Sequence, residues 1–490
     1  MRAALNIFLS EKNLFISGAI ALFLAAYFSK GYYHPDEHFQ ILEFAHYKLS
    51  HAPASELAWE FHAKIRPTTQ PMIAAIFMKV LNTLGLQNPF LISFILRLFA
   101  ASLSFLGIFL FYRTFKEEIK SQKLRIYFLL LTFFTWFILF NSVRFSSEGL
   151  GTSFILIAIS LLFKLKEKNG LHFIYIGSIF GLSFLMRFQI GFLLFGLFLW
   201  LLIFKKLSFT QWLGLGIGVL TLIGLGICID SWFYGEYTLT IWNYFESNII
   251  DGKASSFGES PWWWYFTEFL GSAVPPYSFI LLVGSLYFVI WNWKHPIAFM
   301  FVFFLLGHIV VAHKELRFLF PIAPFLPFMT LISLEHFNAK KNFQLMTQPV
   351  VRFIVITGLV VNFVLTLVVC FRPTDPHTVM FENIWNNYKE PVKIYYFQNN
   401  PYHRPYTLNF YKRPDLIPVK ANSVSEIQLN SDTTQLVLVH FQERDSLKNL
   451  DGKFVYMTYP EWVLQYNFND WLSRSYVYYI VELPSASTTK

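Results

Sequence analysis

Apolar stretches separated by short polar segments make up most of the chain up to about residue 370. A helix needs about 20 apolar residues to cross a bilayer. About eleven stretches approach that length, at 13–29, 89–112, 126–141, 149–163, 173–187, 190–204, 211–232, 271–291, 297–312, 318–334 and 350–370. The stretches between 126 and 163, and between 173 and 204, allow either two short spans or a re-entrant pair. The pattern therefore predicts a polytopic α-helical membrane protein with about 11 transmembrane helices.

The hydrophobic pattern changes after about residue 371, where Asn, Asp, Pro, Tyr and Lys become frequent. "KIYYFQ", "TQLVLVHF" and "KFVYMTY" are short β-branched and aromatic runs between turn residues, which predicts strands. The sequence thus predicts a transmembrane domain at 1–371 and a small α/β domain at 372–490, which is long enough for a modest core of its own.

Composition and charge support a membrane protein. Charged residues make up 14% of the chain and hydrophobic residues 55%, whereas soluble domains usually carry about a quarter charged residues. The net charge of +9 does not indicate nucleic acid, because Lys and Arg occur in short clusters between apolar stretches. The two cysteines lie inside apolar stretches and indicate neither a disulfide framework nor a zinc site.

The basic clusters predict which loops lie on which side of the membrane. They fall at 113–125, 164–168, 205–206, 294 and 340–341, and all are cytoplasmic if the N-terminus is cytoplasmic. The outer side then receives 30–88, 144–148, 187–189, 233–270, 313–317 and 372–490. We expect this outer compartment to be the bacterial periplasm, with the lumen of the endoplasmic reticulum as the alternative.

The first outer loop opens with many ionisable residues, in "YYHPDEHFQILEFAHY" at 32–47. Pro35 suits the first turn of a helix. One face of that helix carries Asp36, Gln40, Glu43 and Tyr47. The pattern predicts an amphipathic helix at the membrane surface, with Asp36 at the end where the helix dipole favours an ionised general base.

Two other interpretations fit the same residues. From the spacing alone, helix capping with a solvated acidic face is the favoured interpretation. A metal site at His34, Asp36 and His38 is less favoured, because alternate positions on a helix point apart.

Three further segments on the outer side carry candidate chemistry. "LAWEFHAKIRP" offers Trp59, Glu60 and Arg66, and "PWWWY" is either an aromatic belt at the interface or a set of rings that stack on sugar faces. "HKELR" offers His313, Lys314 and Arg317, in breach of the charge rule that the other loops obey. These basic groups either reach for the interface or bind a lipid-linked phosphate.

Five blocks occur in order along the chain: "HPDEHFQ", "AWEF…IRP", "DSWFYGEYTLTIWNYFESNI", "SFGESPWWWYF" and "HKELRFLFPIAPFL". In this combination the chain resembles glycosyltransferase family 22, the mannosyltransferases that use dolichyl- or polyprenyl-phosphate mannose. Within that family it resembles the glycosylphosphatidylinositol mannosyltransferase 3 branch, and we expect a bacterial member.

The resemblance implies a C-type glycosyltransferase (GT-C) bundle, a polyprenyl- or dolichyl-phosphate sugar donor and a glycolipid acceptor, with no metal or other cofactor. Asp36 and Glu37 match the family's acidic first-loop motif, and Asp36 stands where the family's catalytic Asp stands. The family's basic block matches His313, Lys314 and Arg317, which we expect to bind the donor phosphate. Substrate contacts are expected from His34, Gln40, Trp59, Glu60, Arg66, Trp263 and Tyr265.

Three functions remain in competition. An inverting mannosyltransferase, with Asp36 as general base, accounts for the acidic and basic blocks together. A lipid-linked sugar transporter would show polar residues in mid-membrane and matching broken helices in two halves, and the apolar stretches have almost no charge at their centres. A non-catalytic subunit of a glycolipid assembly complex, with 372–490 as its docking module, is disfavoured by the intact acidic motif.

Overall fold

The protein folds into two compact units that are interleaved along the chain. The computed structural model describes residues 10–164, 169–341, 344–427, 433–441, 443, 452–475 and 477–484. The first unit comprises Met1–Ser29, Ala63–Ile73 and Phe94–Arg372, and the second comprises Lys30–His62, Ala74–Ser93 and Pro373–Lys490. Most of the first loop therefore belongs to the same unit as the C-terminal residues.

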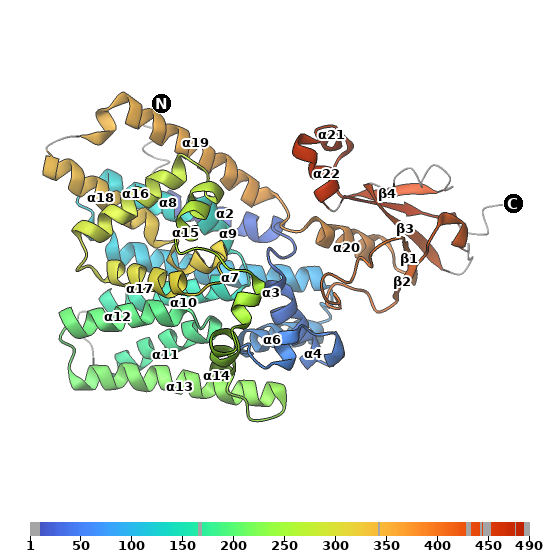
Figure 1. Cartoon of the computed structure of the whole chain (residues 1–490), viewed down its shortest axis with the longest axis horizontal. Coiled ribbons are helices and arrows are strands. Elements are labelled where there is room, and N and C mark those ends of the chain that lie inside the picture. Colours follow the sequence, from blue (N-terminus) through green and yellow to red (C-terminus); the bar gives the residue numbers. More distant parts are fainter. Residues whose placement is uncertain are drawn as a thin grey trace. The chain divides into compact units, whose positions relative to one another are not determined.

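The first unit is a bundle of apolar helices (Figure 1). Every apolar stretch singled out in the sequence contains a helix or a bent helix pair, so the predicted polytopic helical fold is confirmed. The main helices are α2 (Glu11–Phe28), α7 (Pro89–Phe115), α8 (Gln122–Phe134), α9 (Trp136–Ser142), α10 (Ser147–Lys164), α11 (Gly170–Met186), α12 (Ile190–Phe204), α13 (Phe209–Tyr234), α16 (Tyr277–Trp291), α17 (Pro296–Val310), α18 (Phe325–Lys341) and α19 (Pro349–Phe371).

Length and composition mark several of these helices as membrane spans. Among the described residues, five helices are long and apolar enough to cross a membrane, or up to eight spans if each bent pair counts as one. The bent pairs are α8–α9 at 55°, α16–α17 at 114°, and a 3₁₀ turn at Leu316–Ile322 with α18 at 62°. The shorter α11 and α12 are also apolar. The chain is thus an integral, multi-pass membrane protein.

The break between α8 and α9 at Thr135 is stabilised by polar side chains of α19. Asn362 accepts a hydrogen bond from the Trp136 backbone N–H (3.0 Å) and donates to the Phe134 carbonyl (2.7 Å). The Thr366 hydroxyl donates to the same carbonyl at 2.8 Å. A broken helix in an apolar setting needs such partners for its backbone groups, so the break is built into the fold.

Close packing of α11 against α13 depends on small residues at the contact. A Cβ at Gly218 would lie 2.1 Å from the Ile174 carbonyl oxygen, and one at Gly177 would lie 2.3 Å from that of Leu215. Only glycine permits this approach of two backbones, as is common between membrane helices. The two helices run side by side in Figure 1.

The C-terminal part of the second unit forms a mixed β-sheet, which confirms the predicted small α/β domain. Among the described residues the strand order is β2-β1-β3-β5-β4, with β2, β1 and β3 parallel and β5 antiparallel to β3 and β4. The strands are β1 (Val392–Tyr396), β2 (Leu416–Lys420), β3 (Thr434–His440), β4 (Lys453–Met457) and β5 (Tyr478–Glu482). The three runs predicted as strands correspond to β1, β3 and β4.

Helix α20 (Pro376–Asn387) packs on one face of this sheet. Its Met380 and Phe381 side chains meet Ile394 of β1, Leu436 of β3 and Ile480 of β5. Helix α20 follows α19 in the chain, so it is the first element of this part of the unit to pack on the sheet.

Candidate functional site

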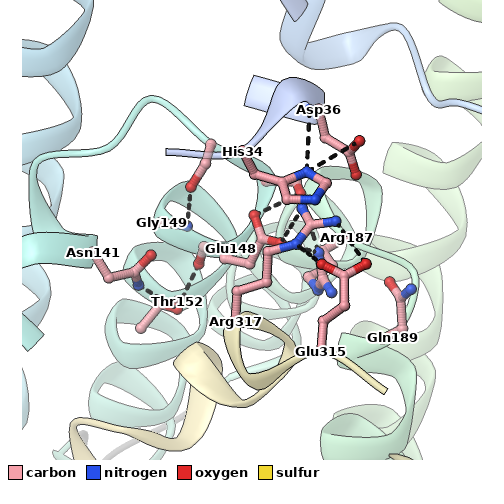
Figure 2. A network of polar contacts seen from close by, with 12 residues as sticks. His34, Asp36, Asn141, Glu148, Gly149, Thr152, Arg187, Gln189, Glu315 and Arg317 are labelled. Atoms are coloured by element: carbon pink, nitrogen blue, oxygen red, sulfur yellow. Dashed lines mark hydrogen bonds and ion pairs between the residues drawn. The ribbon is translucent and has the colours of Figure 1, made fainter. Parts of the chain in front are cut away.

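The acidic motif of the first loop forms the beginning of a helix, as the sequence predicts. The His34 Nδ1 atom accepts a hydrogen bond from the Asp36 backbone N–H at 3.3 Å, and Pro35 occupies the first turn of α3 (Pro35–Glu37). The Glu37 carboxylate accepts from the Tyr33 backbone N–H at 3.1 Å. His34 also lies 3.3 Å from Asp36 Oδ1 (Figure 2). The Asp36 side chain remains partly exposed.

Asp36 is tied to a second carboxylate through one amide. Gln40 Nε2 donates to Asp36 Oδ1 at 2.9 Å and to Glu60 Oε1 at 2.8 Å. Both amide hydrogens are thereby used, and Gln40 and Glu60 are buried. This bridge orients the Asp36 carboxylate and brings together three residues that the sequence named. Trp59 begins α5 (Trp59–His62) beside Glu60.

Every residue from His38 to Ala45 is buried, so this segment has no solvated face and the predicted amphipathic surface helix is wrong. A π-helical turn at His38–Leu42 joins α3 to α4 (Glu43–Lys48). The wider turn brings His38 and Glu43, five residues apart, onto the same side, with His38 Nε2 at 2.8 Å from Glu43 Oε1. Glu43, predicted to be on a solvated face, is 2% exposed.

Residues from the C-terminal part of the same unit cover this buried pair. Glu43 Oε1 accepts the Phe410 backbone N–H at 3.0 Å. The His38 ring stacks between Tyr32 and Tyr411, with centroid distances of 5.1 and 5.2 Å. Among the described residues, no group of three or more His, Cys, Asp or Glu side chains is arranged to hold a metal ion.

A buried network of charges in the first unit contains Arg317 (Figure 2). Arg317 Nε lies 2.5 Å from Glu315 Oε2, and its Nη1 lies 3.3 Å from Glu148 Oε1. The same Glu148 oxygen lies 2.6 Å from Arg187 Nη1. The two guanidinium groups also lie 4.9 and 5.2 Å from the centroid of the Phe318 ring, which packs against both.

Two hydrogen-bond donor atoms of Arg187 are not used within this network. Within the described part of the chain, its Nε and Nη2 atoms are buried and have no hydrogen-bond partner. An unsatisfied buried donor costs about 1–3 kcal/mol. A guanidinium group left in this state next to a second one is suited to an anion with several acceptor oxygens.

The other two basic residues of "HKELR" have different surroundings. His313 Nε2 lies 3.0 Å from Glu315 Oε1, and its Nδ1 lies 3.2 Å from the Gly258 carbonyl oxygen. Lys314 is buried and donates to the carbonyl oxygens of its own loop, that of Val311 at 2.5 Å. Burial lowers the pKa of Lys314. Of the three predicted phosphate ligands, Arg317 therefore lies in the buried network, His313 reaches it through Glu315, and Lys314 is bonded to its own loop.

Arg66 and its neighbour Thr68 are held in place by residues in the last turns of α13. Asp230 Oδ1 accepts the backbone N–H and the hydroxyl of Thr68, both at 2.7 Å, and the Tyr234 hydroxyl donates to the Arg66 carbonyl at 2.9 Å. The Arg66 guanidinium lies 6.0 Å from the Tyr244 ring centroid. Tyr244 in turn accepts a hydrogen bond from Gln189 at 2.5 Å, two residues beyond Arg187.

The aromatic residues of "PWWWY" divide between surface and core. Trp263 is 49% exposed, whereas Tyr265 is 1% exposed and its ring packs edge-on near His308, with centroids 6.3 Å apart. Trp263 thus offers an exposed ring, and the buried Tyr265 packs α15 (Trp264–Ser272) against the core.

Sequence reasoning did not single out Glu148, Arg187 or Asp230. A signal for the first two was present, because "RFSSE" and "RFQ" carry charges on the predicted outer side, as "HKELR" does. Glu148 stands in the first turn of α10, beside Gly149 (Figure 2). The Ser146 hydroxyl accepts a hydrogen bond from the Gly149 N–H at 3.1 Å. Arg187 directly follows α11 in extended backbone. Short loops of this kind are easily read as connectors.

Comparison with solved structures identifies the class of this fold. The chain is similar to the crystal structure of ArnT from Cupriavidus metallidurans bound to undecaprenyl phosphate, with a TM-score of 0.54 and 11% sequence identity. The match covers 96% of this chain and 98% of that one. The fold is therefore that of a GT-C membrane glycosyltransferase, as the sequence predicted.

Sequence comparison then gives the family. The Alg9-like mannosyltransferase family matches residues 14–410, so the chain belongs to this family. It is 26% identical to human GPI alpha-1,2-mannosyltransferase 3 over 329 residues, covering 63% of this chain and 55% of that protein. It is 26% identical to GPI mannosyltransferase 3 of Candida albicans over 311 residues, covering 63% and 61%. The aligned chain thus spans less than two thirds of each relative.

Proposed function

We propose that this protein is an inverting mannosyltransferase that moves mannose from a polyprenyl- or dolichyl-phosphate donor to a glycolipid acceptor at the outer or lumenal membrane face. The observation that carries the proposal is the buried Arg187–Glu148–Arg317 network with its spare arginine donors, in a chain of the Alg9-like mannosyltransferase family. Paired guanidinium groups suit a phosphate ester, because their planar forks match its oxygens.

The proposed reaction is a single displacement at the sugar. Asp36 takes the proton of the acceptor hydroxyl as that oxygen bonds to C1 of the mannose. The bond between C1 and the phosphate oxygen breaks, and the lipid phosphate leaves with the electron pair, so the configuration at C1 inverts. A general base typically contributes about 10²–10⁴-fold. Charge stabilisation of the departing phosphate adds to this.

The residues of the second unit support Asp36 in this role. Gln40 fixes the orientation of the carboxylate, and Glu60 fixes Gln40. A base held in one orientation loses less freedom when the acceptor binds. His34 contacts Asp36, and Trp59 directly precedes Glu60 in α5; both are proposed to contact the sugars.

The donor phosphate is proposed to bind to the arginines of the first unit. Arg317 and Arg187 supply the main contacts, because both are buried and share Glu148. Glu148 and Glu315 hold the guanidinium groups in place before the donor arrives. Arg66, Lys314 and His313 are proposed as further donors to the substrate, and the exposed Trp263 ring is proposed to stack on a sugar.

A transfer assay with defined donors tests the proposal. The purified protein, in lipid vesicles, is given tritium-labelled polyprenyl-phosphate mannose and extracted membrane glycolipids. We expect a labelled glycolipid and released polyprenyl phosphate, with no loss of rate on chelation of divalent metals. GDP-mannose should serve as an inactive control donor. Transfer from GDP-mannose alone, or no transfer at all, would contradict the proposed function.

A further inference from the structure

The C-terminal part of the second unit sends one segment, Tyr406–Tyr411, to the helix that carries Asp36. We propose that this segment completes the acceptor side of the Asp36 site, and that the Tyr406 hydroxyl binds a hydroxyl group of the acceptor sugar. The inference rests on the proposed function and deepens it, because it names the part of the chain that recognises the acceptor.

Tyr406 lies beside the network of Asp36, Gln40 and Glu60. Its half-buried ring packs edge-on against Phe39, with centroids 5.5 Å apart. Burial raises the pKa of Tyr406, a hydrogen bond with the Trp59 backbone lowers it, and the charges of Glu60 and Asp36 raise it. The Tyr406 hydroxyl is therefore within the electrostatic reach of both carboxylates.

The segment around Tyr406 is fixed by contacts to the first loop. Asn409 Nδ2 donates to Glu56 Oε2 at 2.6 Å, the Phe410 N–H donates to Glu43 at 3.0 Å, and the Tyr411 ring stacks on His38 at 5.2 Å. On the other side, the Tyr406 carbonyl accepts the Arg404 N–H at 2.7 Å. A tyrosine held from both sides is preorganised, which is what a binding contact requires.

The chemistry around Tyr406 fits a neutral sugar better than a phosphate. The network offers two carboxylates, one amide and one phenol. Carboxylates accept hydrogen bonds from sugar hydroxyls, whereas a phosphate beside Asp36 and Glu60 would meet like charge. The phosphate of the donor belongs instead with the arginines of the first unit, so the Tyr406 side is assigned to the acceptor.

The test is Tyr406→Phe, which keeps the ring and removes only the hydroxyl. Transfer is measured with polyprenyl-phosphate mannose and the synthetic acceptor octyl α-D-mannopyranoside, varying each in turn. We expect the acceptor KM to rise roughly tenfold, the loss of one hydrogen bond to substrate, with the donor KM unchanged. Tyr466→Phe, at an exposed tyrosine of the same unit, should match the wild type.

The outcomes separate the inference from the function on which it rests. If the wild type transfers mannose and Tyr406→Phe has an unchanged acceptor KM, the inference fails alone. Tyr406→Phe could instead lower kcat by the same factor whether the donor or the acceptor is varied, and also lower the melting temperature. That result would make Tyr406 a packing residue and would also overturn the inference. If the wild type transfers nothing from the lipid donor, both the proposed function and the inference fail.

Discussion

Asp36 and Glu37 are adjacent carboxylates with different partners. Asp36 accepts from the Gln40 amide and is partly exposed at the helix start. Glu37 accepts from the Tyr33 backbone and closes the turn before the helix. The general base is therefore proposed to be Asp36, and Glu37 is proposed to support the backbone. This distinction was not accessible to the sequence, because both residues belong to the same short motif.

Arg187 provides a prediction about the donor site. In Arg187→Lys the charge next to Glu148 remains, but the planar fork with its spare donors is lost. We expect the donor-dependent kcat/KM to fall roughly 10- to 150-fold, since a hydrogen bond to a charged group contributes about 1.5–3 kcal/mol. Initial rates at fixed acceptor measure this, with the donor varied.

The matched control is Arg125→Lys in the first turn of α8. Arg125 also pairs with a glutamate, Glu117, at 2.7 Å, but it is not part of the buried network. This variant should keep the wild-type donor dependence. Equal kinetics of Arg187→Lys and the wild type would mean that the phosphate binds elsewhere.

His46 makes the stability of the second unit depend on pH. Burial lowers its pKa to about 4, against a smaller opposing effect of Glu43. Because the unfolded chain binds the proton more readily, stability should fall as the pH drops from about 6.5 towards about 4. His46→Phe cannot take up a proton, so its melting temperature should fall less than that of the wild type between about pH 7.5 and 5.

The control is His403→Phe, at an exposed histidine. If the melting temperature changes equally with pH in the wild type and in both variants, the assignment to His46 is refuted.

At the scale of elements, the length of the apolar stretches predicted where the helices lie, but it did not predict where a helix breaks or widens into a π-helical turn. The break at Thr135 lies inside an apolar stretch and depends on Asn362, more than 200 residues away. The π-helical turn at His38–Leu42 changes which residues share a face, so a spacing argument based on an α-helix misplaced Glu43. Such features arise from tertiary partners, which no local pattern contains.

The sheet shows the same division. Strands β1, β3 and β4 were predicted from their β-branched and aromatic runs. Strand β2 contains Pro418, and a proline argues against a strand in sequence reasoning. The residue is accommodated because β2 lies at the edge of the described sheet, where one side of the strand needs no partner. The sequence alone does not give the order of the strands, so it could not show that β2 lies at an edge.

Asn362→Leu tests the helix break as a designed feature. The substitution removes both hydrogen bonds to the α8–α9 break and leaves the Trp136 N–H without its partner. We expect a loss of about 1–3 kcal/mol in the free energy of unfolding, the cost of an unsatisfied buried group. Val364→Leu, at an exposed position of the same helix, should change little. Unfolding in detergent measures both, and equal stability of the two variants would show that the break needs no side-chain support.

For the whole molecule, the ordered sequence blocks predicted the family and the fold class, and both are confirmed. The sequence did not reveal that the first loop and the C-terminal residues form one unit. Contacts such as that of Glu43 with Phe410 join residues 367 positions apart. The arginine network was also only half predicted, because Glu148 and Arg187 stand at helix ends in short segments that carry no recognisable motif.

The proposed orientation predicts that the first loop is outside the cell. Ser55 is exposed in a 3₁₀ turn at Ala54–Glu56. In a background with Cys228 and Cys370 replaced by Ala, Ser55→Cys should react with an impermeant thiol reagent in intact cells. Lys205→Cys, on the predicted cytoplasmic side, should react only after the membrane is opened. The reverse pattern would place the Asp36 loop in the cytoplasm.

Transfer of labelled mannose by Asp36→Asn tests the central claim most directly. The variant keeps the size and the Gln40 contact region of the side chain but cannot accept a proton as a carboxylate does. The wild type and Glu37→Gln are measured in the same vesicles. Asp36→Asn should lose at least about 10²-fold in transfer rate, and its melting temperature and donor binding should be unchanged. Glu37→Gln should stay active. Near-normal transfer by Asp36→Asn, with loss of transfer in Glu37→Gln, would contradict the account.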